Sequence, residues 1–224
     1  MPFLFVSGTG TGVGKTFSTA VLVRYLANKG HDVLPVKLVQ TGELPGEGDI
    51  FTIERSTGIA GEEFTRFKDP LAPNLAARRE GVEPIQFDQI ISWLLGFDDP
   101  DRIIVVEGAG GLLVRLGEDF TLADVAVAVN APLVIVTSTG LGSLNAAELS
   151  VEAAKHRGLK VLGVLGGSIP QNPDLATMLN LEEFERVTGV PFWGALPEGL
   201  SRVEGFVEKQ SFPALDAFKK PPAR

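Results

Sequence analysis

The hydrophobic positions of the chain fall into short continuous runs, separated by stretches whose apolar residues recur at helical spacing. The runs span residues 3–6, 33–37, 103–106, 133–136, 161–165 and 191–196. The run over 103–106 is β-branched throughout, which is typical of a strand covered on both faces. Helical spacing or helix caps predict helices after residue 16, over 50–57, from Pro84, around 122–126, from a cap at Ser143, and over 174–188 with Asn172 as its cap.

This alternation predicts an α/β fold, a single domain over residues 1–224 with a mostly parallel sheet and helices on both of its faces. Pro35 cannot donate to a sheet ladder, so its strand is expected to lack one neighbour there. The tail from about residue 218 is expected to fray. Ligands of such sheets bind at the carboxyl ends of the strands. Five segments should therefore meet in one crevice: residues 8–16, 37–41, 107–111, 137–142 and 166–170.

A glycine-rich loop from Gly8 to Thr16 lies between the first predicted strand and the first predicted helix. Its glycines allow backbone N–H groups to converge on an anion, and the helix N-terminus adds positive charge. Lys15 can reach the β- and γ-phosphates, and the Thr16 hydroxyl can ligate Mg²⁺. The first glycine stands one residue earlier than in the common P-loop spacing. A plain glycine turn is the alternative, but the preceding strand and the Lys15-Thr16 pair favour a P-loop NTP hydrolase-like fold.

Composition narrows the possible partners and the location. With 28 acidic against 20 basic residues, the formal net charge is −8, which disfavours nucleic acid as a partner. The chain has no cysteine, which excludes thiol nucleophiles and fits a cytoplasmic location. No signal peptide and no membrane-spanning run is expected. His31 and His156 are expected to be solvated, so the mechanism should not depend on histidine.

Three charged residues, two at predicted strand ends and one in a loop, are candidates for the chemistry. Glu107 follows a buried strand directly, where an acidic metal partner of a P-loop protein belongs. Asp49 is a weaker candidate, because an aspartate after a glycine usually serves a turn. Lys37 ends a buried strand and is expected either to stabilise an anion or to pair with a carboxylate that the sequence does not identify.

Several motifs together resemble those of the dethiobiotin synthetases, the biotin-pathway enzymes that close a ureido ring on 7,8-diaminononanoate. The resemblance covers nearly the whole chain and includes residues 139–145. Gly10 and Gly12 stand where the family often has acidic residues, and Leu38 replaces a common proline. The matching motifs are Gly8-Thr9-x-Thr11-x-Val13-Gly14-Lys15-Thr16, Val36-Lys37-x-Val39-Gln40-Thr41-Gly42, Gly48-Asp49 and Val106-Glu107-Gly108-Ala109-Gly110-Gly111.

The resemblance implies ATP as co-substrate, Mg²⁺ as cofactor, the diamine and CO₂ as substrates, and a homodimer with its active site at the subunit interface. It implies catalytic roles for Lys15, Lys37 and Thr11. The implied metal ligands are Thr16, Asp49 and Glu107. The implied nucleotide contacts are Gly12, Val13, Gly14, Lys15, Thr16, Phe17, Gly166, Ser168, Pro197 and Gly199. The implied substrate contacts are Thr11, Lys37, Thr41, Gly110, Gly142, Leu144 and Asn145.

Other P-loop proteins fit the sequence less well. Amide-forming synthases of the cobyrinate type need a nucleophilic cysteine, which this chain lacks. Partitioning and division-site ATPase switches carry an additional lysine early in the P-loop, where this chain has residues 8–10 as Gly-Thr-Gly. A GTPase would show an Asn-Lys-x-Asp motif, but Gly166-Gly167-Ser168 stands there. Many relatives read adenine with an asparagine at that place, so we expect relaxed selectivity for the nucleotide base.

Overall fold

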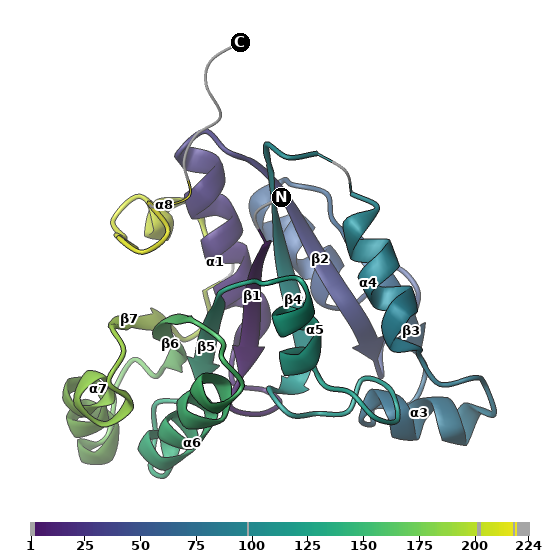
Figure 1. Cartoon of the computed structure of the whole chain (residues 1–224). Coiled ribbons are helices and arrows are strands. Elements are labelled where there is room, and N and C mark those ends of the chain that lie inside the picture. Colours follow the sequence, from purple (N-terminus) through teal and green to yellow (C-terminus); the bar gives the residue numbers. More distant parts are fainter. Residues whose placement is uncertain (1–2, 98, 201–202, 217, 219–224) are drawn as a thin grey trace.

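Seven parallel strands form one sheet in the computed structural model of the protein, which describes residues 3–97, 99–200, 203–216 and 218 (Figure 1). The strand order is β3-β2-β4-β1-β5-β6-β7, and every pairing is parallel. The predicted fold class is confirmed. The strands are β1 (Phe3–Gly8), β2 (Asp32–Thr41), β3 (Glu62–Phe67), β4 (Arg102–Gly111), β5 (Leu133–Thr137), β6 (Val161–Ile169) and β7 (Phe192–Pro197).

Eight helices among the described residues cover both faces of the sheet (Figure 1). Helices α1, α2 and α8 pack on one face, and α3 to α7 contribute to the core on the other. The helices are α1 (Lys15–Asn28), α2 (Asp49–Thr57), α3 (Pro73–Glu80), α4 (Phe87–Leu95), α5 (Leu122–Ala128), α6 (Ser143–His156), α7 (Leu175–Thr188) and α8 (Glu204–Val207).

The central strands are buried on both faces, and their side chains alternate between the two cores. In β4, Ile104 and Val106 belong to the core under α3 to α7, whereas Ile103 and Val105 belong to the core under α1 and α2. The two-residue repeat of a strand therefore directs Glu107 towards α1. Lys37 of β2 is the register partner of Glu107. Parallel neighbours in register share a face, so the lysine and the glutamate meet below the P-loop.

Several strands extend further than their apolar runs predict. Strand β2 continues past Lys37 to Thr41, β4 to Gly111 and β6 to Ile169. These strand ends are stabilised by hydrogen bonds to neighbouring strands. The sequence of a single segment does not reveal such pairing. Before Val36, β2 pairs with β4 alone, so Pro35 lacks a partner on the β3 side as predicted.

Strand β3 was not predicted from the sequence, and the predicted starts of three helices were wrong. Strand β3 is an edge strand of mixed polarity, with residues 62–67 reading Glu-Glu-Phe-Thr-Arg-Phe. Helix α4 begins at Phe87 rather than at Pro84. Helix α6 is preceded by Gly142 in the left-handed region, and Ser143 is its first residue rather than its cap. The cap of α7 is Asp174, not Asn172, because the Asp174 carboxylate accepts a hydrogen bond from the Thr177 backbone at 2.7 Å.

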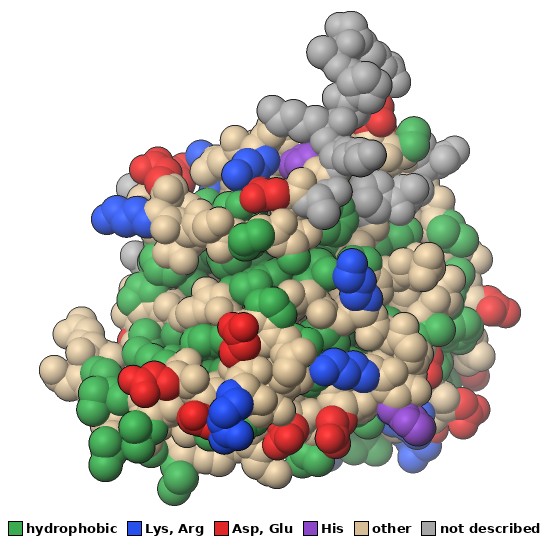
Figure 2. Space-filling view, turned by 60° about the vertical axis from the view of Figure 1, so that its left-hand side comes forward, with side chains coloured by type: hydrophobic (Ala, Val, Ile, Leu, Met, Phe, Trp, Pro, Cys, Tyr) green, Lys and Arg blue, Asp and Glu red, His purple; other side chains and the backbone are tan. Residues whose placement is uncertain are grey.

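The expectations for the histidines, the C-terminal tail, membrane spans and surface charge have the following outcomes. His31 is buried, contrary to prediction, whereas His156 is exposed as expected. Apart from Phe218, the predicted fraying tail lies outside the described residues. None of the helices in the described ranges combines the length and apolar composition needed to cross a bilayer. Acidic and basic side chains are interspersed on the face shown in Figure 2, and the absence of a nucleic-acid partner stays a prediction.

Candidate active site

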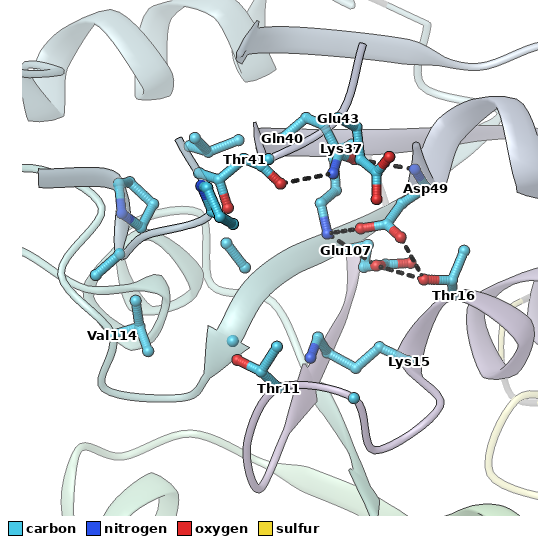
Figure 3. Close-up of a pocket in the computed structure, with 18 of the residues that line it drawn as sticks. Thr11, Lys15, Thr16, Lys37, Gln40, Thr41, Glu43, Asp49, Glu107 and Val114 are labelled. Atoms are coloured by element: carbon cyan, nitrogen blue, oxygen red, sulfur yellow. Dashed lines mark hydrogen bonds and ion pairs between the residues drawn. The ribbon is translucent and has the colours of Figure 1, made fainter. Parts of the chain in front are cut away.

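A pocket of about 810 Å³ opens at the carboxyl ends of β1, β2 and β4 (Figure 3). Three of the five predicted segments contribute to its lining: residues 8–16, 37–41 and 107–111. The other two segments contact the P-loop instead of lining the pocket. Thr137 lies 3.3 Å from Thr9 between their hydroxyl oxygens, and a Cβ on Gly14 would stand 2.4 Å from the Gly167 carbonyl oxygen.

The P-loop is shaped by positive backbone angles and by close contact with β6. Gly14, which caps α1, has φ 92°, a conformation that favours glycine. A Cβ on Gly167 would lie 1.8 Å from the Val13 carbonyl oxygen, so only glycine fits there. Lys15 Nζ donates to the Gly10 carbonyl at 2.8 Å, and burial lowers the pKa of Lys15. In this protein the lysine therefore folds over its own loop and lies beside the phosphate position.

Lys37 is buried between the two carboxylates that the sequence suggested as metal ligands. Its Nζ lies 2.5 Å from Asp49 Oδ2 and 2.9 Å from Glu107 Oε1, and it donates to the Gly108 carbonyl at 2.9 Å. Burial alone would lower the pKa of Lys37, but the attraction of Glu107 and Asp49 outweighs it and raises that pKa. Lys37 is therefore a charged lysine within β2. The carboxylate partner that the sequence did not identify turns out to be two residues, Asp49 and Glu107.

Thr16 brings the third predicted metal ligand into the same cluster. Its hydroxyl donates to Asp49 Oδ1 at 2.6 Å and lies 3.3 Å from Glu107 Oε1. Burial raises the pKa of Glu107, although the Lys37 charge opposes the shift. Burial acts on Asp49 in the same direction, but Lys37 outweighs it and lowers the pKa of Asp49.

The oxygen atoms of this cluster fit a hard divalent cation. Thr16, Asp49 and Glu107 supply one hydroxyl and two carboxylates, the donor types that Mg²⁺ accepts. Two carboxylates against Lys37 leave a net negative charge, which a cation would neutralise. Among the described residues no three Asp, Glu, His or Cys side chains form a metal-binding group. The residues therefore suit an ion that shares its coordination with substrate phosphates and water.

Part of the pocket lining is apolar, and residues 70–73 and Val114 within it were not predicted. This apolar part consists of residues 70–73, which lead into the start of α3, together with Val39, Ala109 and Val114. Thr11, Thr41 and Gly110, which the family resemblance implied as substrate contacts, line the same pocket. Residues 70–73 and Val114 carry no chemical group that a sequence motif would single out, so only the fold identifies them.

Other predicted contact residues lie outside this pocket. Gly142, Leu144 and Asn145 stand at the start of α6 and do not line it. Gly166, Ser168, Pro197 and Gly199 lie at or just after the ends of β6 and β7 and do not line it either. The Ser168 carbonyl there accepts a hydrogen bond from the Thr139 hydroxyl at 2.9 Å. The roles of these residues stay predictions.

The chain is similar in sequence to proteins of known family. Residues 3–202 match the family model described as an AAA domain. The chain is 95% identical over 224 residues, all of both chains, to the ATP-dependent dethiobiotin synthetase BioD of Corynebacterium glutamicum (strain R). It is 53% identical over 212 residues to the protein of the same name from Corynebacterium diphtheriae, covering 95% of this chain and 94% of that one.

Solved structures of low sequence identity share the fold. The MinC:MinD cell division protein complex of Aquifex aeolicus matches with a TM-score of 0.53 at 16% identity, covering 97% of this chain and 89% of that one. A ParA family ATPase from Chlorobium tepidum TLS matches with a TM-score of 0.52, also at 16% identity, covering 97% and 94%. At that identity the likeness concerns the fold alone.

Proposed function

Because the chain belongs to the family of ATP-dependent dethiobiotin synthetases, we propose that it closes a ureido ring on 7,8-diaminononanoate with CO₂ and ATP. The products are dethiobiotin, ADP and phosphate. The observation that carries the mechanism is the position of Lys37, which is buried between Asp49 and Glu107 beside Thr16 of the P-loop. The pocket therefore contains the P-loop with its Lys15 and, beside it, the second positively charged side chain, Lys37.

The reaction divides into three balanced steps. One amino group adds to CO₂ to give a carbamate and releases a proton. A carbamate oxygen attacks the γ-phosphorus of ATP, ADP leaves, and a carbamic-phosphoric anhydride forms. The second amine then attacks the carbamate carbon, phosphate leaves, and the ring closes as that nitrogen releases a proton. The carbamate, the transferring phosphoryl group and the anhydride are anionic, so fixed cations lower the barriers.

The residues of the pocket serve these steps by binding and orientation. The P-loop backbone and Lys15 hold the triphosphate, with Lys15 exchanging the Gly10 carbonyl for phosphate oxygens. Lys37 stabilises the carbamate and the transferring phosphoryl group, and Thr11 contacts the substrate. Positioning an already nucleophilic carbamate supplies much of the acceleration, so no histidine is needed.

Thr16, Asp49 and Glu107 would hold Mg²⁺, which when bound spreads the negative charge of the phosphates. Thr41 and Gly110 lie on the same pocket and contact the diamine end of the substrate. The apolar wall of residues 70–73, Val39 and Val114 supports the proposal, because it suits the aliphatic chain of the diamine.

We further propose a homodimer in which α6 of one protomer completes the site of its partner. Gly142, Leu144 and Asn145 present a helix N-terminus, which suits the substrate carboxylate. Apolar side chains exposed on and near α6 and α7 support such an interface, since Leu141 is 91% exposed and Leu175 67%. Mixing Lys15→Ala chains with Asn145→Ala chains should restore activity in heterodimers. No restoration after proven subunit exchange would count against a shared site.

A phosphate-release assay tests the proposed function directly. Release should require both the diamine and bicarbonate, and it should vanish in Lys15→Ala. The alternative, an ATPase switch of the partitioning or division-site type, would release phosphate with nucleotide alone. The chain has Gly10 in the region where those switches carry their additional lysine, which favours the synthetase.

A further inference from the structure

We propose that Gln40 is a positioning residue, which fixes Asp49 in the orientation required for the metal and for Lys37. Gln40 lies near the end of β2, and its Oε1 accepts a hydrogen bond from the Asp49 backbone N–H at 2.9 Å (Figure 3). Asp49 is the first residue of α2. Its carboxylate contacts both Lys37 and Thr16. The amide of Gln40 therefore connects the sheet to the residue on which the cluster depends.

Both ends of the Gln40 amide are engaged within the protein, so the side chain is not directed at a ligand. Oε1 accepts from Asp49, and Nε2 donates to the Thr41 carbonyl at 3.3 Å. Gln40 is 5% exposed. The backbone N–H on one side and the carbonyl on the other determine which end of the amide carries the oxygen.

Helix α2 depends on the Gln40 oxygen as an acceptor, because its own N-cap residue has no side chain that could accept a hydrogen bond. The N-cap is Gly48, which has no side chain and has φ 107°. The first N–H groups of a helix need acceptors from outside the helix. A Cβ on Gly48 would lie 2.7 Å from Gln40 Oε1, so the glycine is what allows the amide to approach. Gly48 and Gln40 thus act together: the glycine leaves room for the amide, and the amide accepts the hydrogen bond from Asp49.

The loop before α2 has a separate anchor, so the effect of Gln40 is confined to the helix start. Arg66 of β3 donates to the carbonyls of Glu43 and Glu47 at 3.2 and 2.9 Å. The Asp49 side chain is 29% exposed, more than its partners Lys37 at 3% and Glu107 at 0%. Without the hydrogen bond that its backbone N–H donates to Gln40 Oε1, Asp49 is the member of the cluster that is free to turn towards solvent.

The test is the Mg²⁺ dependence of ADP binding, measured by calorimetry with Gln40→Met, which keeps the length of the side chain and removes the acceptor. Groups that orient metal ligands typically contribute about 10- to 100-fold in metal affinity. Gln40→Met should raise the Mg²⁺ concentration for half-maximal ADP binding about 10-fold or more and leave ADP affinity in EDTA within about 2-fold. Gln40→Glu, which keeps an acceptor oxygen, should lie nearer the wild type.

Two outcomes would overturn the proposal: an unchanged Mg²⁺ requirement in Gln40→Met, or an equal loss of ADP affinity with and without Mg²⁺. If Gln40→Met does not fold, Gly48→Ala takes its place, because its methyl group displaces the same amide. An unchanged Mg²⁺ requirement there would also overturn the proposal. Asp174→Ala is the matched control, since it removes the cap of α7 away from the pocket and should leave the Mg²⁺ requirement unchanged.

The inference rests on the proposed role of Asp49, and Asp49→Asn separates the two claims. If Asp49→Asn leaves the Mg²⁺ dependence of ADP binding unchanged, the metal assignment is wrong. If Asp49→Asn raises the Mg²⁺ requirement and Gln40→Met does not, the metal assignment stands and the role of Gln40 is refuted.

Discussion

Replacing Lys37 with methionine should destabilise the protein as well as inactivate it. The sequence placed this lysine at the end of a buried strand, either to stabilise an anion or to pair with a carboxylate that it did not identify. In the structure it is 3% exposed and lies within contact distance of Asp49 and Glu107. Lys37→Met keeps the aliphatic stem but leaves the Glu107 carboxylate buried without its cation. Removal of one partner from a buried ion pair typically costs about 3–5 kcal/mol of unfolding free energy.

Urea unfolding followed by far-UV circular dichroism, in EDTA and without nucleotide, measures this loss. For a chain of this size, 3–5 kcal/mol corresponds to a melting temperature lower by roughly 6–20 °C. The double variant Lys37→Met/Glu107→Gln should lose less than Lys37→Met, because it no longer buries that unpaired charge. A loss below about 1 kcal/mol for Lys37→Met would refute the buried pair, since exposed ion pairs contribute amounts of that order.

Three further predictions concern the loop, the C-terminal segment and the base. Gly167→Ala should weaken ADP binding about tenfold or more in calorimetry, because its methyl group collides with the Val13 carbonyl; unchanged binding would contradict that contact. Tyr25→Phe should lower the unfolding free energy by about 1 kcal/mol without loss of activity, because the Tyr25 hydroxyl donates to Asp216 and accepts from the Phe212 backbone N–H. An unchanged midpoint of urea unfolding would refute this contribution. The kcat/KM values for ATP, CTP, GTP and UTP should agree within about tenfold, because Gly166-Gly167-Ser168 stands where many relatives have an adenine-reading asparagine, and one lost pair of hydrogen bonds removes roughly 1–3 kcal/mol of discrimination. A thousandfold preference for ATP would show that another group reads adenine.

The parts of the fold that follow from local pattern were predictable. Short apolar runs located β1, β4, β5 and β6, and the Gly14-Lys15-Thr16 sequence located the start of α1. Strand β3 was not predictable in this way. Its residues 62–67 are mostly polar, and they become a strand because β2 offers them an open edge. The open edge of β2 is a property of the sheet and cannot be read from residues 62–67.

The site shows the same division between local and long-range information. Lys15 and Thr16 follow from one contiguous motif, whereas the partners of Lys37 come from residues 49 and 107. Their meeting depends on the register of β2 against β4 and on where α2 begins. Gln40 was part of a recognised motif without a role, because its hydrogen bond to Asp49 spans a loop that only the folded chain closes.

Transfer of an oxygen isotope tests the proposed reaction most directly. If the carbamate oxygen attacks the γ-phosphorus, that oxygen leaves with phosphate when the ring closes. With the diamine, ATP and freshly added ¹⁸O-labelled bicarbonate, mass spectrometry should detect ¹⁸O in the phosphate, one phosphate per ring formed, and neither product with Lys15→Ala. Ring formation accompanied by phosphate free of ¹⁸O, in a sample whose bicarbonate still carries the label, would contradict the carbamic-phosphoric anhydride.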